Sequence, residues 1–525
     1  MNQNYSTLTL TPWFYVVLLF LVVLIWASVD VITETFSSLR KLPGPFEARL
    51  SRLWYFRHVR DGNFHHRNIQ LHEKYGAIVR IAPKQYSINN PAVIKTIYGI
   101  GKGFLKSAWY EASSPVGLPW QDLFTDRDGA RHAANRRLVA NLYSVTSLRA
   151  MESDVEDCLR VFVKQLGDLS QTQKPIDLQF WMQCYAFDVV SQITLGQRFG
   201  CLDTGSDRLG IFASQHVYLK YCAMVGIEHE LHGTLDWILS KLSPGQLMNG
   251  VNFTAEQLKK GKARFDMEKG SPDRQDFMSK LFRLHHEKPG KFPESAVFTT
   301  CMTNIGAGSD TTSISLCAVI YDLASHPTVL QRLREYIDAK FAELDNPEFI
   351  PFKDAQAMSF LQACIKESLR LHPATGLPLA RVVPKGGVNL LGRDFNEGCV
   401  VGVNTWVLHR NKDVFGADAD EYRPDRWFSQ DKELISLMES NWIPVSQILV
   451  EFPWIIFDWS SLPQFGVGSR TCIGKNISLL EINKLVPILV KTFDFTPVEP
   501  ERIRHENYWL VKQVDMLCRV SPRST

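Results

Sequence analysis

Ten residues near the C-terminal end, 465–474, constrain the fold more than any other part of this 525-residue chain. They read Phe-Gly-Val-Gly-Ser-Arg-Thr-Cys-Ile-Gly and place one cysteine, Cys472, after a glycine-rich turn. An apolar run from Ile473 to Leu485 follows and predicts a helix. A thiolate at the start of a helix is stabilised by free backbone N–H groups and by the positive end of the helix dipole. The motif therefore predicts a cysteine that binds a partner through its sulfur; a buried structural cysteine is the alternative.

The residues around Cys472 indicate which partner it binds. Gly468 and Gly474 allow the turn to fold closely over a flat group, and Arg470 supplies a cation near the sulfur. An iron porphyrin needs an axial thiolate, N–H donors, room for a planar ring and a partner for a propionate. The pattern Phe-x-x-Gly-x-Arg-x-Cys-x-Gly, which begins at Phe465, resembles the haem-binding loop of the cytochrome P-450 family, the haem-thiolate monooxygenases. The resemblance implies haem b as the cofactor, with Cys472 on the iron and the other four residues around the porphyrin.

A second motif lies in the long buried helix predicted for residues 298–325, which ends at His326-Pro327. Its middle, residues 307–312, reads Ala-Gly-Ser-Asp-Thr-Thr, and most of these residues have low helix propensity. Their small side chains let a flat ligand approach the helix. An acid–alcohol pair there can deliver protons to dioxygen, with Asp310 as the relay from solvent and Thr311 as the hydrogen-bonding group. The string resembles the oxygen-activation motif of the family. A small-residue packing contact between helices is the alternative.

A third motif pairs charges around an amphipathic helix predicted for residues 360–371. Glu367 and Arg370 lie at i and i+3 on one face of that helix and can pair. Downstream, residues 422–427 resemble the second arginine motif of the family, with Asp425 where glutamate is usual. The resemblance implies that Glu367, Arg370 and Arg426 form a buried structural network on the thiolate side. An ordinary surface ion pair is the alternative.

Haem carries two propionates, and each needs cations. Besides Arg470, the resemblance implies two candidates. Arg136 lies in His132-Ala-Ala-Asn-Arg136, where the family usually has Trp-x-x-x-Arg, and Arg381 matches a strand arginine that reaches a propionate from the other side. His409 is predicted to be a packed core histidine without a role.

The family pattern places the substrate-pocket walls at residues 109–120, 304–308 and 375–379, which are mostly apolar and predict a lipophilic or aromatic small-molecule substrate. Residues 210–235 are expected to form a mobile lid above this pocket. Residues 508–520 alternate enough to predict strands that close it.

Composition bounds the remaining possibilities. No linker, repeat or low-complexity tract divides the chain, so one large domain is expected at residues 46–525. The resemblance implies a mainly α fold with small β-sheets. It also implies that haem lies between a long central helix and the cysteine loop. The net charge of +3 argues against nucleic acid as a partner. The ten cysteines are scattered without a C-x-x-C pair, which predicts neither a disulfide framework nor a cysteine zinc site and fits a reducing compartment.

The N-terminal end predicts a membrane anchor. Residues 12–29 are apolar with aromatic edges, about the shortest length that spans a bilayer. No Lys or Arg precedes the stretch, whereas several follow it, which predicts a luminal tail at residues 1–11 and a cytosolic catalytic domain on the endoplasmic reticulum. Residues 30–45 form a linker that ends in the proline hinge Leu42-Pro-Gly-Pro45. A cleaved signal peptide is the alternative.

Twenty residues, 445–464, depart from the family pattern. Without them the chain reads Asn-Trp-Ile-Pro-Phe-Gly-Val-Gly, a normal approach to the haem loop, and they contain the apolar aromatic run Phe452 to Phe457. We interpret the block as a retained intron, which sequencing of the transcript tests; a genuine membrane-touching loop is the alternative.

These motifs together resemble a microsomal cytochrome P-450, in particular fungal secondary-metabolism members such as pisatin demethylase and the benzoate hydroxylases. The implied reaction is hydroxylation or O-demethylation of a lipophilic small molecule with dioxygen. The chain has no Gly-x-Gly-x-x-Gly fingerprint, so electrons are expected from a separate NADPH-cytochrome P-450 reductase. A haem-thiolate isomerase or dehydratase is one alternative. A non-catalytic membrane haem protein, if residues 445–464 block the thiolate face, is the other.

Overall fold

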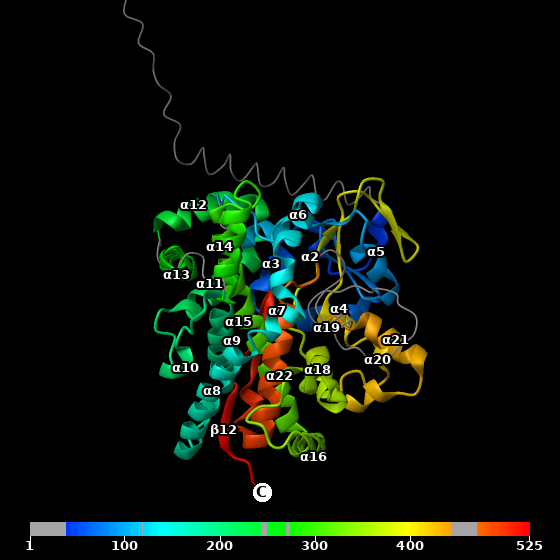
Figure 1. Ribbon diagram of the computed structural model, residues 1–525. Coiled ribbons are helices and arrows are strands. Elements are labelled where there is room, and N and C mark those ends of the chain that lie inside the picture. Colours follow the sequence, from blue (N-terminus) through cyan, green and yellow to red (C-terminus); the bar gives the residue numbers. More distant parts are fainter. Residues whose placement is uncertain are drawn as a thin grey trace, which may run out of the picture.

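The computed structural model describes residues 38–114, 116–117, 119–242, 249–268, 273–443 and 470–524. Helices dominate it, and they gather on the left and centre of the view in Figure 1, while strands from the blue N-terminal and the yellow segments lie side by side on the right. The described helices of eight or more residues are α3 (Leu53–Arg60), α4 (Phe64–Tyr75), α6 (Gly129–Val139), α8 (Glu152–Thr172), α9 (Leu178–Leu195), α11 (Ile211–Val225), α12 (His232–Leu242), α13 (Asn249–Met267), α14 (Phe277–Glu287), α15 (Glu294–Ser325), α16 (Pro327–Glu343), α18 (Ser359–Leu371), α21 (Lys432–Asn441) and α22 (Lys475–Thr492).

The longest of these helices, α15, runs through the core and packs against α9, α18 and α22 (Figure 1). It is apolar around most of its circumference, which is typical of a helix buried on all sides. It begins after Pro293 and stops at Ser325, because Pro327 disfavours helical geometry at the preceding His326. The long helix predicted from residue 298 is therefore confirmed, and it starts four residues earlier.

Four small sheets complete the fold. The largest has the strand order β1-β2-β8-β5-β3, with β2 and β8 parallel and the other pairs antiparallel. Its strands are β1 (Ile78–Ala82), β2 (Gln85–Ile88), β3 (Leu105–Lys106), β5 (Arg381–Val382) and β8 (Val400–Gly402). The others are the order β4-β12-β9 (Ile176–Asp177, Leu517–Pro522, Phe493–Pro497), the hairpin β10–β11 (Arg504–Tyr508, Leu510–Val514) and the hairpin β6–β7 (Val388–Leu390, Arg393–Phe395). The predicted mainly α architecture with small β-sheets is confirmed, as are strands within residues 508–520.

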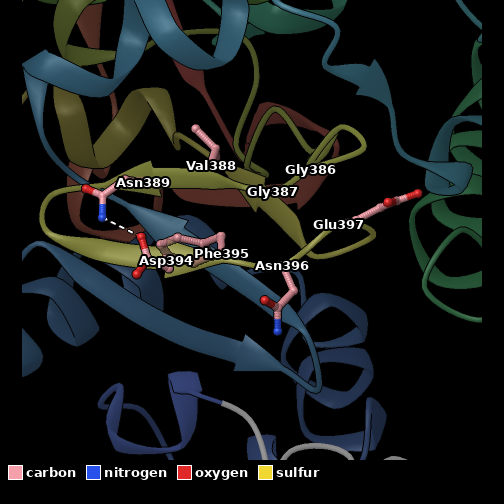
Figure 2. A pocket seen from close by; sticks show the side chains of 8 residues that line it. All are labelled: Gly386, Gly387, Val388, Asn389, Asp394, Phe395, Asn396 and Glu397. Carbon is pink, nitrogen blue, oxygen red and sulfur yellow. Dashed lines mark hydrogen bonds between the residues drawn. The ribbon is translucent and has the colours of Figure 1, made fainter.

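An open hollow lies at the β6–β7 hairpin. Figure 2 shows its lining, in which the Asn389 amide donates to an oxygen of Asp394 over 2.6 Å. Gly386 and Gly387 enter the hairpin with φ of 90° and 72°, which residues with a Cβ rarely adopt. No residue that the sequence motifs single out lines this hollow, so it is not the candidate site.

Several predictions fall outside the described residues. These are the luminal tail at 1–11, the anchor at 12–29, the first part of the linker at 30–45, the atypical block at 445–464, Phe465 and Gly468. Within the described part of the chain, no single helix has the length and apolar composition to cross a membrane, and only the pair α15 and α16, bent by 108°, meets those criteria together.

Candidate active site

Cys472 lies two residues before Gly474, the residue that caps α22. It is half-buried, whereas the other nine cysteines are fully buried. Burial raises the pKa of the Cys472 thiol, and the N–H groups of Gly474 and Lys475 with the charge of Arg136 lower it by less. The N–H groups at the helix start favour the thiolate, as expected from the sequence, but burial outweighs them. A coordinated metal cation would supply the missing charge, because a metal deprotonates a thiol ligand outright.

A group of cations gathers around Arg470, two residues before this cysteine. Arg470 donates to the carbonyl of Asp126 over 2.6 Å, and burial followed by the charge of Arg381 lowers the pKa of its guanidinium. Lys106 is the register partner of Arg381 across β3 and β5. Burial, then the charges of Arg381 and Arg470, hold the pKa of Lys106 well below its usual value. The Asp126 carboxylate is already paired with Arg131 at 2.8 Å. Such mutually repelling cations favour an added anion.

His132 on α6 provides the test of whether haem fits here. Its side chain is 1% exposed, and its Nδ1 atom has no hydrogen-bond partner. Burial, then the charges of Arg470 and Arg136, lower its pKa to about 3, so the ring is neutral. A buried ring nitrogen without a partner costs about 1–3 kcal/mol. An anionic group between His132, Arg136 and Arg470 removes this cost, so the residues present fit a haem propionate.

The middle of α15 is uncovered although the rest of the helix is core. Gly306 and Ala307 are exposed, and a Cβ added to Gly306 would meet no atom within 4 Å. Gln215 of α11 donates to the carbonyl of Gly306. The Thr311 hydroxyl donates back to the carbonyl of Ala307 over 3.0 Å. This strip therefore offers free space beside the predicted acid–alcohol pair.

Asp310 is buried and belongs to a relay of polar side chains. Its Oδ1 atom accepts from Gln183 over 2.5 Å, and the Gln183 carbonyl accepts from Lys512 over 2.7 Å. Burial raises the pKa of Asp310 more than the charges of Lys512 and His216 lower it. A narrow pocket reaches this carboxyl and is also lined by His216, Glu506 and Lys512. Asp310 is thus a poised acid next to titratable groups at the surface.

Glu367, Arg370 and Arg426 meet in one buried cluster. Glu367 is 0% exposed and accepts from Arg370 at 2.8 and 3.0 Å and from Arg426 at 2.7 Å. The indole of Trp427 donates to the same carboxylate over 3.0 Å. Asp425, at the position where glutamate is usual, lies outside the cluster and pairs with Arg332. The geometry is that of an interior support, not of a surface ion pair.

One hydrogen bond ties the oxygen motif to the cysteine helix. Thr312, the neighbour of Thr311 on α15, shares a 2.8 Å hydrogen bond with Ser478 on α22, six residues after Cys472. The acid–alcohol pair, the half-buried cysteine and the cation cluster therefore surround one region. The chain belongs to the cytochrome P450 family. The family model for cytochrome P450 matches residues 43–517.

Relatives in fungi agree with this assignment. Two pisatin demethylases of Fusarium vanettenii are each 36% identical to this P450, over 93% and 94% of the chain and 90% and 92% of their own lengths. The cytochrome P450 monooxygenase pkfB of Emericella nidulans is 34% identical over 95% of the chain and 94% of its own length. The chain is therefore a P450 monooxygenase, an oxidoreductase whose family uses a haem-thiolate cofactor, dioxygen and a redox partner.

A cluster of aromatic side chains in this P450 joins residues 109 and 110 to the β10–β11 hairpin. Trp109 donates through its indole to the carbonyl of Ala223 on α11, over 3.3 Å. Its ring contacts Trp509 at 4.8 Å between centroids, and Tyr110 contacts Trp509 at 5.7 Å. Trp509, at the turn of the β10–β11 hairpin, has φ of 76°, which is a genuine outlier for a bulky residue. Such backbone strain persists where surrounding structure holds it in place, often at binding sites.

Several contributors to the site were missed by reasoning from the sequence. Lys106 and Gln183 lie in no motif, and no local signal marks them. Trp509 and Lys512 lie in the strands predicted within residues 508–520, but nothing in the sequence singles them out there. His409, predicted as a core histidine, is buried and links the Glu367 cluster to the segment before the cysteine loop: Nδ1 contacts the Arg370 carbonyl at 3.0 Å, and Nε2 accepts from the N–H of Ile443 at 2.7 Å. These bonds require a neutral ring, and burial lowers its pKa to about 3.

Glu481 on α22 predicts a pH-dependent stability. Its carboxyl is 0% exposed, neither oxygen has a hydrogen-bond partner, and burial holds its pKa well above 4.5. The unfolded chain ionises above about pH 4.5 while the folded one stays protonated, so stability falls as pH rises through this window. Relative to the parent, Glu481→Gln should gain about 1.4 kcal/mol per pH unit there. Melting temperatures between pH 5 and 9 measure this, with exposed Glu335→Gln as the control; a pH-independent difference would contradict it.

Proposed function

We propose that this P450 is a membrane-anchored enzyme that holds haem b and hydroxylates or O-demethylates a lipophilic, aromatic small molecule in secondary metabolism. The observation that carries the proposal is the uncovered strip of α15 at Gly306 and Ala307, whose carbonyl accepts from the Thr311 hydroxyl. Trp109, in a segment predicted to form a wall of the pocket, packs against Trp509. Flat apolar ligands suit a site lined by aromatic side chains. The name of the pisatin demethylases, at 36% identity, supports demethylation as one form of the reaction.

Residues of this chain would hold the cofactor through its iron and its propionates. Cys472 would bind the iron through its sulfur, and Arg136, Arg381 and Arg470 would pair with the propionates, with His132 donating from its free ring nitrogen. When bound, haem would supply the iron centre for the chemistry of dioxygen, and the Cys472 thiolate would donate electron density to that iron. The Glu367 cluster keeps the segment on the thiolate side in place.

Protons reach the reacting centre through Asp310 and Thr311. Asp310 has a raised pKa and faces the pocket lined by His216, Glu506 and Lys512, so it exchanges its proton with water that enters there. The Gln183 amide holds the carboxyl in one orientation. Thr311 passes the proton on when its hydroxyl leaves the Ala307 carbonyl, to which it donates now. Electrons come from NADPH-cytochrome P450 reductase on the same membrane.

A reconstituted assay tests the proposed function. The full-length protein, with reductase, NADPH and a panel of lipophilic aromatic ethers and phenols, is expected to give a product 16 mass units heavier or to release formaldehyde from a methoxy group. Spectral shifts on ligand addition select the compounds for the assay. Conversion that needs neither NADPH nor dioxygen would contradict the proposal.

Thr311→Ala is expected to lower the ratio of product formed to NADPH consumed by about 10²-fold, because a positioned proton donor contributes that much or more. Hydrogen peroxide release should rise in parallel and is measured in the same assay. Thr300→Ala is the matched control, since the Thr300 hydroxyl also donates back to a helical carbonyl, that of Ala296 at 2.7 Å. An equal ratio of product formed to NADPH consumed in Thr311→Ala and Thr300→Ala would exclude a role for Thr311.

The predicted topology is tested by glycosylation. With the N-terminus in the lumen, the sequon Asn4-Tyr5-Ser6 is expected to carry sugar, and Asn476-Ile477-Ser478 is not. Asn476 is half-buried, and its amide donates to the carbonyl of Tyr143 over 2.8 Å. Glycosidase shifts of the parent, of Asn4→Gln and of Asn476→Gln measure this. A shift that depends on Asn476 would place the catalytic domain in the lumen and refute the topology.

A further inference from the structure

Three histidines from two distant parts of the chain come together away from the haem region. His65 and His66 lie in the first turn of α4, and His505 lies on β10. One ring nitrogen from each lies within 4.8 Å of the other two. We propose that His65, His66 and His505 form a binding site for a divalent zinc ion. This inference does not depend on the proposed reaction.

The state of His65 points to a missing ligand. Its side chain is 0% exposed, and neither Nδ1 nor Nε2 has a hydrogen-bond partner. Leaving a buried polar atom unpaired costs about 1–3 kcal/mol, so a ring with two such atoms is costly. The Trp406 ring packs edge-on at 4.5 Å and holds the imidazole in place. A metal ion that accepts the lone pair of one nitrogen removes part of this cost.

Two further polar side chains face the cluster. His372 is occupied, since its Nε2 contacts the carbonyl of Val511 at 2.9 Å. Arg410 donates to the carbonyl of Leu371 at 2.8 Å and pairs with Asp420 at 3.4 Å, so its charge is partly balanced. Its remaining field opposes a cation and limits the affinity of the site. Burial, and to a smaller extent the charge of Arg410, lowers the pKa of each of the three imidazoles, and the neutral ring is the form that binds metals.

The donor set selects the metal. Three neutral imidazoles without a carboxylate suit zinc, copper or nickel and disfavour magnesium and calcium. Zinc with three protein ligands keeps a fourth position for water. His66 is exposed, so an ion can enter from solvent without unfolding the chain.

Zinc at this site would connect α4 to the hairpin β10–β11. That hairpin carries Trp509, which packs against Trp109, and Lys512, which lines the pocket at Asp310. A zinc ion would therefore restrain the β10–β11 hairpin, which contacts both Trp109 and the pocket at Asp310. Its occupancy is expected to raise the melting temperature of the protein.

Calorimetry on the haem-loaded protein, first dialysed against a chelator, tests the site. Titration with zinc chloride is expected to show one saturable equivalent, and His66→Ala and His505→Ala should each weaken binding at least tenfold and abolish the zinc-dependent rise in melting temperature. His286→Ala is the matched control, because His285 and His286 are also adjacent, with ring centroids 5.7 Å apart. It should bind zinc as the parent does.

Copper(II) provides a second readout that does not depend on stability. Its electron paramagnetic resonance spectrum in the parent is expected to show hyperfine coupling to imidazole nitrogens, which His505→Ala reduces. Absence of saturable zinc binding overturns the proposal. So does zinc affinity that stays unchanged in both His66→Ala and His505→Ala, which would mean that the ion binds elsewhere.

Discussion

A Cys472→Ser protein is expected to lose the thiolate-type haem spectrum and at least 10³-fold of its monooxygenase turnover. The hydroxyl of serine stays protonated where a thiol ligand is deprotonated by its metal, so the variant lacks the anionic axial ligand that favours O–O cleavage. The measurement is the carbon monoxide difference spectrum of the reduced protein, in which thiolate-bound iron absorbs near 450 nm.

Cys399→Ser is the matched control for this experiment. It makes the same chemical change at a cysteine that is 6% exposed, at the start of β8 and far from α22 in sequence. The control should keep the spectrum and the turnover. If Cys472→Ser keeps both as well, the sulfur is not the iron ligand and the assignment of the whole site fails.

Glu367→Gln is expected to destabilise the folded protein by about 3–5 kcal/mol. The glutamate is 0% exposed and compensates Arg370 and Arg426, which are 0% and 4% exposed. Removing the negative charge leaves the buried Arg370 without its carboxylate partner and Arg426 with Asp418 alone, 3.2 Å away. The remaining amide also cannot accept all the bonds that the carboxylate accepts now. Because His409 links the cluster to Ile443, upstream of Cys472 in the chain, haem content should fall as well. Denaturant unfolding and the ratio of haem to protein absorbance measure the two effects.

The exposed pair Arg332–Asp425 supplies the control for the buried cluster. Its atoms are 2.7 Å apart, as close as those of Glu367 and Arg426, but both side chains are more than half exposed. Asp425→Asn should therefore change the stability by less than about 1 kcal/mol. Similar losses in the two variants would show that burial does not set the energy of the Glu367 cluster.

Residues that are close in the chain could be predicted well. Asp310 and Thr311 are adjacent, and Glu367 and Arg370 are one helical turn apart, so their proximity follows from local geometry as soon as the helix is recognised. The helix start after Cys472 and the stop at Pro327 follow from the same local rules. The long apolar stretch of α15 was visible for the same reason, since a helix apolar on all sides has no other stable place than the core.

The protonation state of Cys472 could not be predicted from the sequence. From sequence, the helix start after Cys472 predicted a thiolate stabilised by N–H groups. In the structure, burial outweighs those groups and raises the pKa of the thiol. The balance depends on how much protein surrounds the sulfur, and local sequence does not contain that quantity.

Local sequence therefore determined the fold class, the family and the residues that carry its motifs. Tertiary structure alone decided which distant side chains join them: Lys106 facing Arg381 across two strands, Lys512 reaching Asp310 through Gln183, and Trp509 against Trp109. It also brought His505 to His65 and His66, which are more than 400 residues away in the chain. The physical reason is that such contacts depend on the packing of whole helices and strands, and a side chain's neighbours across a core leave no periodic or compositional trace beside it in the sequence.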